Sequence, residues 1–214
     1  LAPEDFAAFG FFLPAGMQVL TYPIAGPGND IRPGRRRSNL VWYLPVSRAE
    51  LDDLLTDAEG RRHEIGIPPP LVRSDAIARM RALAEARLPP QHRAVLEVAE
   101  RPFVAPIYDH VAPTLAVGRV ALAGDAACVA RPHVGMGVTK AALDAVALAR
   151  HLGGGRPVAE ALAAYSAERQ PAAAAAHAES RRLGGFLLDG SGDAAGRANP
   201  RCDEVMRRTA VVVT

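Results

Sequence analysis

Two apolar runs near the start of the chain carry the β-branched and aromatic residues typical of strands. These runs are "MQVLTYPI" (residues 17–24) and "LVWYLPV" (residues 40–46), and they flank the turn-rich segment "AGPGNDIRPGRRRS". The pattern predicts a hairpin or a neighbouring antiparallel pair. Pro23 and Pro45 lie near the strand ends, where a missing amide donor is tolerated.

Helical signals follow these strands. Ser47 and Glu50 form a capping-box pattern ahead of a short helix, which the prolines of "GIPPPLVR" cannot continue. A second helix is predicted over residues 75–87, and Pro89 and Pro90 mark its end. One face of it carries Ile77, Met80, Leu83 and Ala84. The segment "RPFVAPIYDHV" (residues 101–111) then predicts another strand.

Downstream the chain is rich in alanine and helical in pattern. A strand "RVALA" (residues 119–123) precedes a helix that ends at glycines 153–155. Residues spaced by three and four share one face of this helix: Val138, Ala142, Ala145, Ala149 and Leu152. Pro157 opens a further helix that Pro171 is expected to kink or interrupt. We expect a loop over residues 186–201 and a strand or frayed end over residues 209–214.

Composition narrows the class of protein. The chain has 214 residues, 49% of them hydrophobic, so it is long enough for a substantial core. A net charge of only +2 and an isolated Arg35–Arg37 run without a nucleic-acid motif disfavour nucleic-acid binding. No apolar run reaches membrane-spanning length, and Cys128 and Cys202 are expected to be free thiols in the cytoplasm. The pattern favours an α+β fold with a sheet-rich domain at 1–112 and a second domain at 113–214.

Candidate chemistry concentrates in "GRVALAGDAACVARPHVGMG" (residues 118–137). Asp125 directly follows Gly124 at the predicted end of a strand, where an ionised carboxylate suits a sugar or ribitol hydroxyl. Gly135 and Gly137 precede the helix that starts near Val138, so its free amides are able to face a partly negative ligand oxygen. With the rigid Pro132 ahead of this turn, the arrangement suits a flavin better than a phosphate.

These residues resemble the second flavin-binding motif of the class A FAD-dependent aromatic hydroxylases, the para-hydroxybenzoate hydroxylase type. The shared order is a strand, Gly124-Asp125, Pro132, the turn from Gly135 to Gly137, and a helix containing Asp144-Ala145. The segments "YPIAG…RRRSNLVWYLPV" and "LPPQHRAVLEVAERPFVAPIYDHV" further resemble the dihydroxypyridine hydroxylase branch. The resemblance implies a partial FAD/NAD(P)-binding-fold hydroxylase that reduces FAD with NADH or NADPH and hydroxylates a small electron-rich aromatic or hydroxypyridine ring. In this interpretation residues 1–112 are the substrate-binding domain, and residues 113–214 are the C-terminal part of the FAD-binding domain with trailing helices.

The resemblance also assigns roles to residues. It implies that Asp125, after Gly124, binds the ribitol chain and that Pro132 lies beside the flavin ring. The implied contacts to the pyrimidine edge are the amides of Gly135, Met136 and Gly137, at the helix start near Val138. His133, next to Pro132, is a candidate catalytic residue. Candidate substrate contacts are Trp42, Tyr43 and Tyr108, although aromatic residues in strands more often fill a core.

One part of the family pattern is absent from the sequence. No strand is followed by a G-x-G-x-x-G turn that opens a helix, which is the motif that binds pyrophosphate. We therefore expect this chain alone to bind FAD weakly or not at all. We also expect the missing portion to leave apolar surface uncovered, which favours a homo-oligomer.

Alternative interpretations remain beside the flavin hypothesis. Cys128, His133 and Asp125 match no zinc spacing, so no metal site is predicted. The "DGSGD" around Ser191 lacks the first glycine of a nucleophile elbow, which disfavours a hydrolase. The rival function is a catalytically inactive remnant or accessory protein that binds an aromatic ligand or a partner chain.

Overall fold

The computed structural model describes residues 8–188, which form two compact units. The first unit comprises the described residues up to Pro106 together with Leu187 and Leu188, and the second comprises Ile107–Phe186. The predicted domain boundary at 112/113 falls a few residues into the second unit. The predicted tail strand over residues 209–214, most of the predicted loop over residues 186–201, Ser191 and Cys202 lie outside the described residues.

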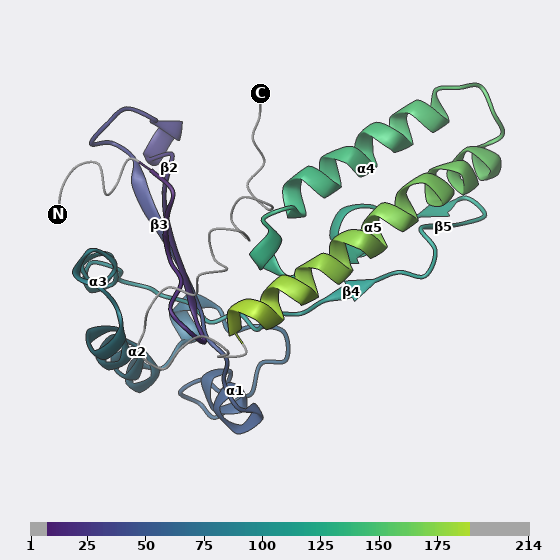
Figure 1. Cartoon of the computed structure of the whole chain (residues 1–214). Coiled ribbons are helices and arrows are strands. Elements are labelled where there is room, and N and C mark those ends of the chain that lie inside the picture. The colour runs from purple at the N-terminus through teal and green to yellow at the C-terminus, as the bar shows by residue number, and fades with distance from the viewer. Residues whose placement is uncertain (1–7, 189–214) are drawn as a thin grey trace. The chain divides into compact units, whose positions relative to one another are not determined.

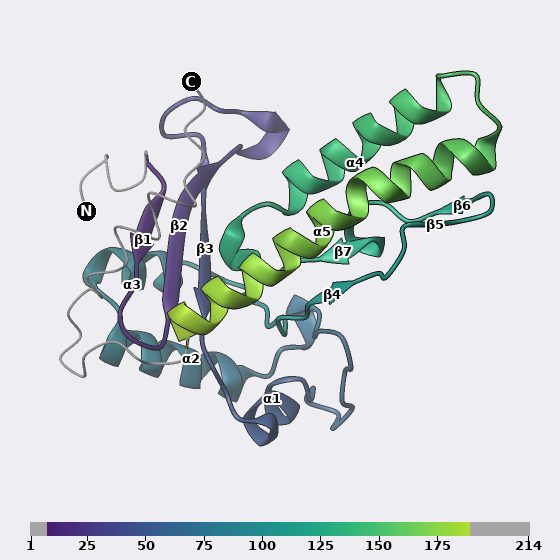
Figure 2. The same cartoon turned by 45° about the vertical axis from the view of Figure 1, so that its right-hand side comes forward.

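The first unit contains a three-stranded antiparallel sheet (Figure 2). Its strands are β1 (Gly10–Phe12), β2 (Gln18–Ile24) and β3 (Arg37–Tyr43), in the order β1-β2-β3. Val19 lies opposite both Phe12 and Trp42, so these three side chains share one face. The antiparallel pair predicted from the two apolar runs is confirmed. The short β1 has no counterpart among the predicted elements.

Helices α2 (Ser74–Arg87) and α3 (Pro90–Glu97) pack on that face of the sheet (Figure 1). The buried core between them comprises Met17, Val19, Ala84, Leu88 and Leu96. The end predicted for α2 is confirmed, but the same proline pair also begins a helix that was not predicted. Pro90 occupies the first position of α3, where its missing amide costs no hydrogen bond.

Helix α1 (Arg48–Leu54) begins at the predicted capping box. The Glu50 amide donates to Ser47 Oγ at 3.2 Å, and the Ser47 amide donates to Glu50 Oε2 at 2.7 Å. Two short 3₁₀ turns, η2 (Pro27–Asn29) and η3 (Pro69–Leu71), complete the first unit at proline-rich segments.

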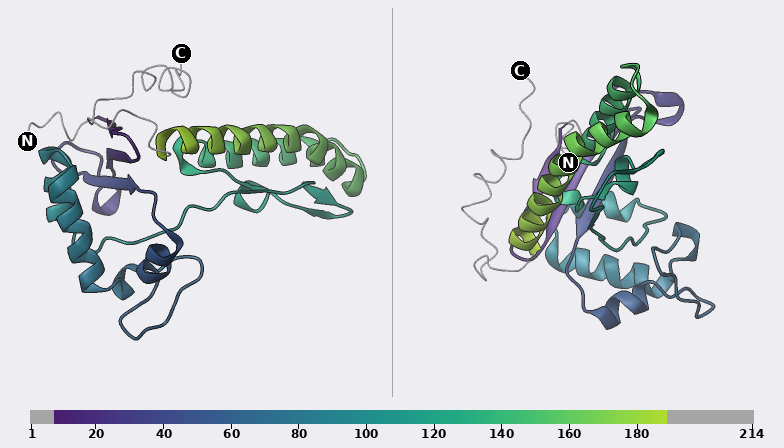
Figure 3. Two further views of the ribbon diagram at one scale, coloured as in Figure 1. Left: turned by 60° about the horizontal axis from the view of Figure 1, so that its bottom comes forward. Right: turned by 90° about the vertical axis from the view of Figure 1, so that its right-hand side faces the viewer.

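The second unit is built around two helices that lie side by side and antiparallel (Figures 1 and 3). They are α4 (Gly137–Leu152) and α5 (Val158–Leu188), and the glycines after Leu152 end the first as predicted. Tyr165 of α5 is fully buried, and its hydroxyl donates to the Leu122 carbonyl at 2.8 Å. Ala112, Leu115, Ala127 and Ala147 complete this core.

Short strands and turns line the helix pair. β4 (His110–Val111) pairs with β7 (Cys128–Val129), and β5 (Ala116–Val117) pairs with β6 (Val120–Ala121). The turn η4 (Gly124–Ala126) lies between β6 and β7, and the turn η5 (Pro132–Val134) lies between β7 and α4. The predictions of strands over all of 101–111 and 119–123 are therefore wrong in extent. Prolines interrupt the first segment, and among the described residues the second pairs only with the two residues of β5.

Helix α5 continues through Pro171, so the predicted interruption does not occur. The proline removes the donor that the Ala167 carbonyl needs, yet the run of alanines after it has the highest helix propensity of any residue type. Ala173, Ser180 and Leu183 after the proline are buried, so tertiary packing also holds this half of the helix in place.

Helix α4 presents its apolar residues to solvent. The predicted shared face, with Val146 added, is here named the α4 apolar face, and all its members are exposed: Val138, Ala142, Ala145, Val146, Ala149 and Leu152. The buried positions of α4 are instead Lys140, Asp144 and Ala147. No helix within residues 8–188 combines the length and apolar character needed to cross a bilayer.

Candidate functional site

The turn at Gly124 presents an exposed carboxylate. Gly124 has a φ of +58°, in the left-handed region that favours glycine, and it begins the η4 turn. Asp125 is exposed, and its side chain makes no hydrogen bond or ion pair with any described residue. An ionised carboxylate in this position is free to accept a hydrogen bond from a ligand hydroxyl.

The second turn presents free backbone amides. Gly135 has a φ of +62°, and its amide donates to the Pro132 carbonyl at 2.9 Å. Helix α4 then starts without a side-chain cap, and its first backbone bond runs from the Lys140 amide to the Met136 carbonyl at 2.8 Å. Within the described chain, the amides of residues 137–139 therefore have no acceptor, and these residues are exposed.

The two turns form one candidate site because α4 connects them. A side chain at Gly124 would come within 3.5 Å of the Ala141 Cβ on the second turn of α4. Beside Gly135 and Gly137, by contrast, an added Cβ would meet nothing within 4 Å. The arrangement offers an acceptor for a hydroxyl, donors for a partly negative oxygen, and open space at the glycines. This set fits the ribitol and pyrimidine edge of a flavin.

His133 does not share this exposed surface. Its ring is buried, and a Cβ added to Gly184 of α5 would approach His133 Cδ2 to 2.8 Å. Burial, and secondarily the Arg131 charge, lowers the pKa of His133 to about 4. The neutral imidazole thus packs against α5 while Pro132 is exposed, so the structure does not favour the predicted catalytic role for His133.

The approach to Pro132 is anchored from α5. The Arg131 amide donates to Ser180 Oγ at 3.0 Å, and Ser180 Oγ donates to the His177 carbonyl at 2.7 Å. The Arg131 guanidinium also pairs with Asp109, Nε to Oδ2, at 2.6 Å. These bonds hold the chain immediately before Pro132 against the helix.

The candidate substrate residues are distributed over both units. Trp42 and Tyr43 are neighbours on β3 and so point to opposite faces of the sheet. Trp42 packs against the core under α2 and α3, which matches the core-filling interpretation. Tyr43 lies on the other face, and burial with a smaller effect of Tyr22 raises its pKa to about 12, so its hydroxyl stays protonated. Tyr108 belongs to the second unit and is 49% exposed.

Lys140 and Asp144 are site residues whose roles the sequence did not reveal. The Lys140 Nζ donates to the Gly124 carbonyl at 2.6 Å, and the Gly124 amide donates to Asp144 Oδ2 at 3.0 Å. Asp144 had a signal only in the Asp-Ala pair of the family motif, and Lys140 had none. Charged residues at a spacing of four ordinarily indicate the solvent face of a helix, whereas here that face is buried.

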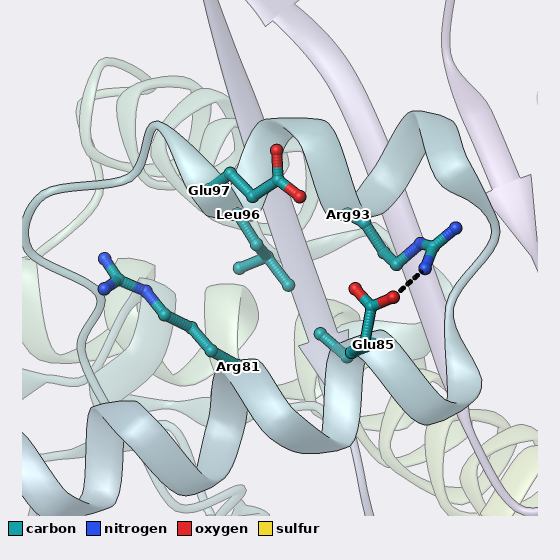
Figure 4. A pocket seen from close by; sticks show the side chains of 6 residues that line it. Arg81, Glu85, Arg93, Leu96 and Glu97 are labelled. Carbon is teal, nitrogen blue, oxygen red and sulfur yellow. Dashed lines mark hydrogen bonds and ion pairs between the residues drawn. The ribbon is translucent and has the colours of Figure 1, made fainter.

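A shallow pocket of about 110 Å³ lies between α2 and α3 of the first unit (Figure 4). Its side chains are mostly charged, and Arg93 pairs with Glu85 at 2.5 Å across it. None of the predicted site residues lines this pocket. Within residues 8–188, no group of three His, Cys, Asp or Glu side chains is placed to hold a metal ion.

Comparisons with known proteins find similarity to an FAD-binding family model and to two monooxygenases. Residues 5–109 match a family model described as FAD binding domain-like. The 2,6-dihydroxypyridine 3-monooxygenase of Paenarthrobacter nicotinovorans is 34% identical over 132 residues, which is 61% of this chain and 32% of that protein. The kynurenine 3-monooxygenase of Salinispora arenicola is 34% identical over 169 residues, covering 75% of this chain and 36% of that protein.

A solved structure extends the match to the fold. The 2,6-dihydroxypyridine-3-hydroxylase from Arthrobacter nicotinovorans superposes with a TM-score of 0.80 at 26% identity, over 92% of this chain and 51% of that one. The chain thus spans about half the length of this similar structure and about a third of its curated relatives. By these matches and its own Gly124-Asp125, Pro132 and Gly135–Gly137 residues, the chain is similar to the class A FAD-dependent hydroxylases.

Proposed function

We propose that the chain forms the ribitol- and ring-binding part of a monooxygenase that hydroxylates a small electron-rich aromatic or hydroxypyridine ring. The observation that carries the proposal is the exposed Asp125 carboxylate on a turn that packs against the uncapped start of α4. A phosphate site would not need an acceptor-only carboxylate beside its amide donors, because two anions repel. A flavin has both a hydroxylated chain and a ring carbonyl, so it matches both halves of the site.

Each residue then has a defined task. Asp125 accepts a hydrogen bond from a ribitol hydroxyl, and the amides of Met136 and of residues 137–139 donate to the pyrimidine edge. The Gly135 amide, which the resemblance also placed at this edge, donates instead to the Pro132 carbonyl. Pro132 supplies a rigid apolar surface beside the ring. Bound FAD supplies the redox and oxygen chemistry, and the protein supplies position and shields the ring from water.

The proposed substrate class rests on the relatives, and the proposed electron donor rests on the family resemblance of the sequence alone. Two of them are described as monooxygenases of dihydroxypyridine and of kynurenine, which supports a small aromatic or heterocyclic substrate. Tyr43 and Tyr108 remain candidate contacts to that ring. NADH or NADPH stays the predicted donor. No relative named above is described as inactive or as an accessory protein, so the rival function gains no support.

Two further expectations concern partners and location. We propose that the α4 apolar face supports self-association. All six of its side chains, from Val138 to Leu152, are exposed, and no other part of the second unit covers them. A cytoplasmic location stays a prediction, with Cys128 present as a buried free thiol.

Flavin binding tests the proposal. The purified chain is mixed with FAD and desalted, and we expect little flavin absorbance to remain because the sequence lacks a pyrophosphate-binding G-x-G-x-x-G turn. The chain is then supplied with the dinucleotide-binding portion of its dihydroxypyridine-hydroxylating relative. Here we expect retained flavin and NAD(P)H oxidation stimulated by members of a panel of hydroxypyridines and phenols.

The Asp125→Ala variant tests whether this exposed side chain contributes to FAD affinity. In the supplemented protein it removes one charge-assisted hydrogen bond to the ribitol, and we expect FAD affinity to fall by about tenfold or more. Glu160→Ala, at an exposed acid on α5, is the matched control and should leave affinity unchanged. Equal affinity of Asp125→Ala and the parent would exclude the assigned role, and tight FAD binding by the chain alone would contradict the first expectation.

A further inference from the structure

Side chains of helix α4 form hydrogen bonds with both the amide and the carbonyl of Gly124. Its amide donates to Asp144 Oδ2 at 3.0 Å, and its carbonyl accepts from Lys140 Nζ at 2.6 Å. The carbonyl also accepts from the Ala127 amide at 3.1 Å, which closes the η4 turn. Lys140 and Asp144 are four residues apart and therefore lie on the same side of α4.

The two side chains that bind Gly124, those of Lys140 and Asp144, are charged and buried. Lys140 is 3% exposed and Asp144 is 1% exposed. Arg169 of α5 donates from Nε to Asp144 Oδ1 at 2.8 Å, while the Lys140 ammonium lies 3.7 Å from Asp144 Oδ2. Two cations thus share one carboxylate in the interior of the second unit. Ions are rarely buried this fully unless they are paired and hydrogen-bonded.

Helix stability does not account for Lys140. It lies in the first turn of α4, where the positive end of the helix dipole opposes a cation. Well-packed apolar residues often replace buried ion pairs without loss of stability. An apolar side chain of similar length would lose the hydrogen bond to the Gly124 carbonyl.

The hydrogen-bonded Gly124 peptide directly precedes Asp125. Gly124 is held in the left-handed conformation, and Asp125 follows it directly on the exposed side of the turn. We propose that Lys140 and Asp144 are positioning residues that clamp the Gly124 peptide and thereby aim the Asp125 carboxylate at its ligand. Arg169 orients Asp144 from the neighbouring helix. The identity of that ligand as the ribitol chain of FAD rests on the proposed function.

The clamp is tested first without flavin. Lys140→Met keeps the length of the stem, removes the ammonium and leaves Asp144 paired with Arg169. Backbone hydrogen exchange of the full chain is measured by mass spectrometry. We expect exchange of the amides over residues 124–127 to rise about tenfold, as for the loss of one charge-assisted hydrogen bond. Exchange in the centres of α4 and α5 and the thermal midpoint should be unchanged, or the midpoint raised.

Two further variants complete the test. Arg156→Met, which removes an exposed cation in the loop between α4 and α5, is the matched control and should leave exchange over residues 124–127 unchanged. Asp144→Asn, which weakens the hold on the Gly124 amide, should raise exchange in the same segment. Faster exchange throughout α4 and α5 in Lys140→Met would assign the residue a general structural role and overturn the proposal. Unchanged exchange over residues 124–127 would overturn it as well.

Addition of FAD then separates the clamp from the proposed function. In the protein supplied with the dinucleotide-binding portion of its relative, saturating FAD should slow exchange over residues 124–127 in the parent and in Arg156→Met, but much less in Lys140→Met. Equal protection in all three would overturn the aiming of Asp125 by the clamp. If FAD protects none of them, FAD binding by this chain fails, whereas the clamp is still decided by the exchange measured without flavin.

Discussion

Gly184 of helix α5 lies against the turn that carries Pro132. A Cβ added there would lie 2.8 Å from His133 Cδ2 and 3.2 Å from Arg131 Cδ. The adjacent Gly185 has nothing within 4 Å of its Cβ position. The neutral, buried His133 is therefore accommodated by the absence of a side chain at one position of the helix. Of these two neighbouring glycines, only Gly184 lies where an added side chain would meet another residue.

This difference between the two glycines predicts opposite effects of one substitution. Gly184→Ala should lower the free energy of unfolding by about 1–3 kcal/mol, because the His133 ring must shift. Gly185→Ala should raise it by up to about 1 kcal/mol, because alanine has the higher helix propensity. Urea unfolding followed by circular dichroism measures both. Stabilisation by both variants would show that His133 yields without cost.

At the scale of elements, Asp109 ties the strand segment of the second unit to α5. Its Oδ1 accepts from Arg181 at 2.8 Å and lies 3.0 Å from His177 Nε2, both on α5. Its Oδ2 accepts from Arg131 at 2.6 Å. Burial by itself raises the pKa of Asp109, but the bonds from Arg131, His177 and Arg181 outweigh it and hold the pKa at about 2.

A depressed pKa makes this tie sensitive to acid. Because the folded-state pKa lies below the unfolded value of 3.8, the stabilisation is fully present above that value and is lost as pH falls towards 2. Asp109→Asn should therefore lower the free energy of unfolding at pH 7 by about 1–3 kcal/mol. The difference from the parent should shrink between pH 5 and pH 2 in urea titrations. Glu160→Gln, at an exposed acid, serves as control; a difference independent of pH would refute the assignment.

At the scale of the whole molecule, apolar surface is left open on one helix. Val138 is 85% exposed and Val146 is 63% exposed, and the alanines between them form a flat, small-residue strip. Contiguous exposed apolar patches favour association, because contact with a second surface removes them from water. The α4 apolar face therefore bears on the oligomeric state of the protein.

Replacing both valines tests self-association. Val138→Gln with Val146→Gln should weaken concentration-dependent association by about tenfold or more, because two side chains no longer bury apolar surface at a contact. Glutamine retains good helix propensity, so the fold should persist. The control pair Ile31→Gln and Ile65→Gln changes aliphatic residues that are 71% and 80% exposed elsewhere. Sedimentation equilibrium gives the association constants; a monomeric parent, or equal weakening by the control pair, would exclude this face.

Local sequence signals predicted much of the fold. The β2–β3 pair, the capping box of α1, the extent of α2 and the start and end of α4 follow from strand propensity, caps and glycine stops, all of which act over a few residues. The site turns at Gly124 and Gly135 were likewise visible, because a left-handed conformation demands glycine. The short extent of β4 and β6 could not be predicted, because a strand forms only where a partner strand lies beside it, and local sequence does not reveal that partner.

The sequence by itself determined where the two turns and the helix start of the candidate site lie, because the Gly-Asp, proline and Gly-x-Gly order is a local requirement of these elements. Only the tertiary structure decided which way those residues face. It buried the charged side of α4 and exposed the apolar side, turned His133 towards α5, and placed Lys140 and Asp144 on the Gly124 peptide. Periodicity identifies the two sides of a helix, but burial depends on what the rest of the chain packs against each of them.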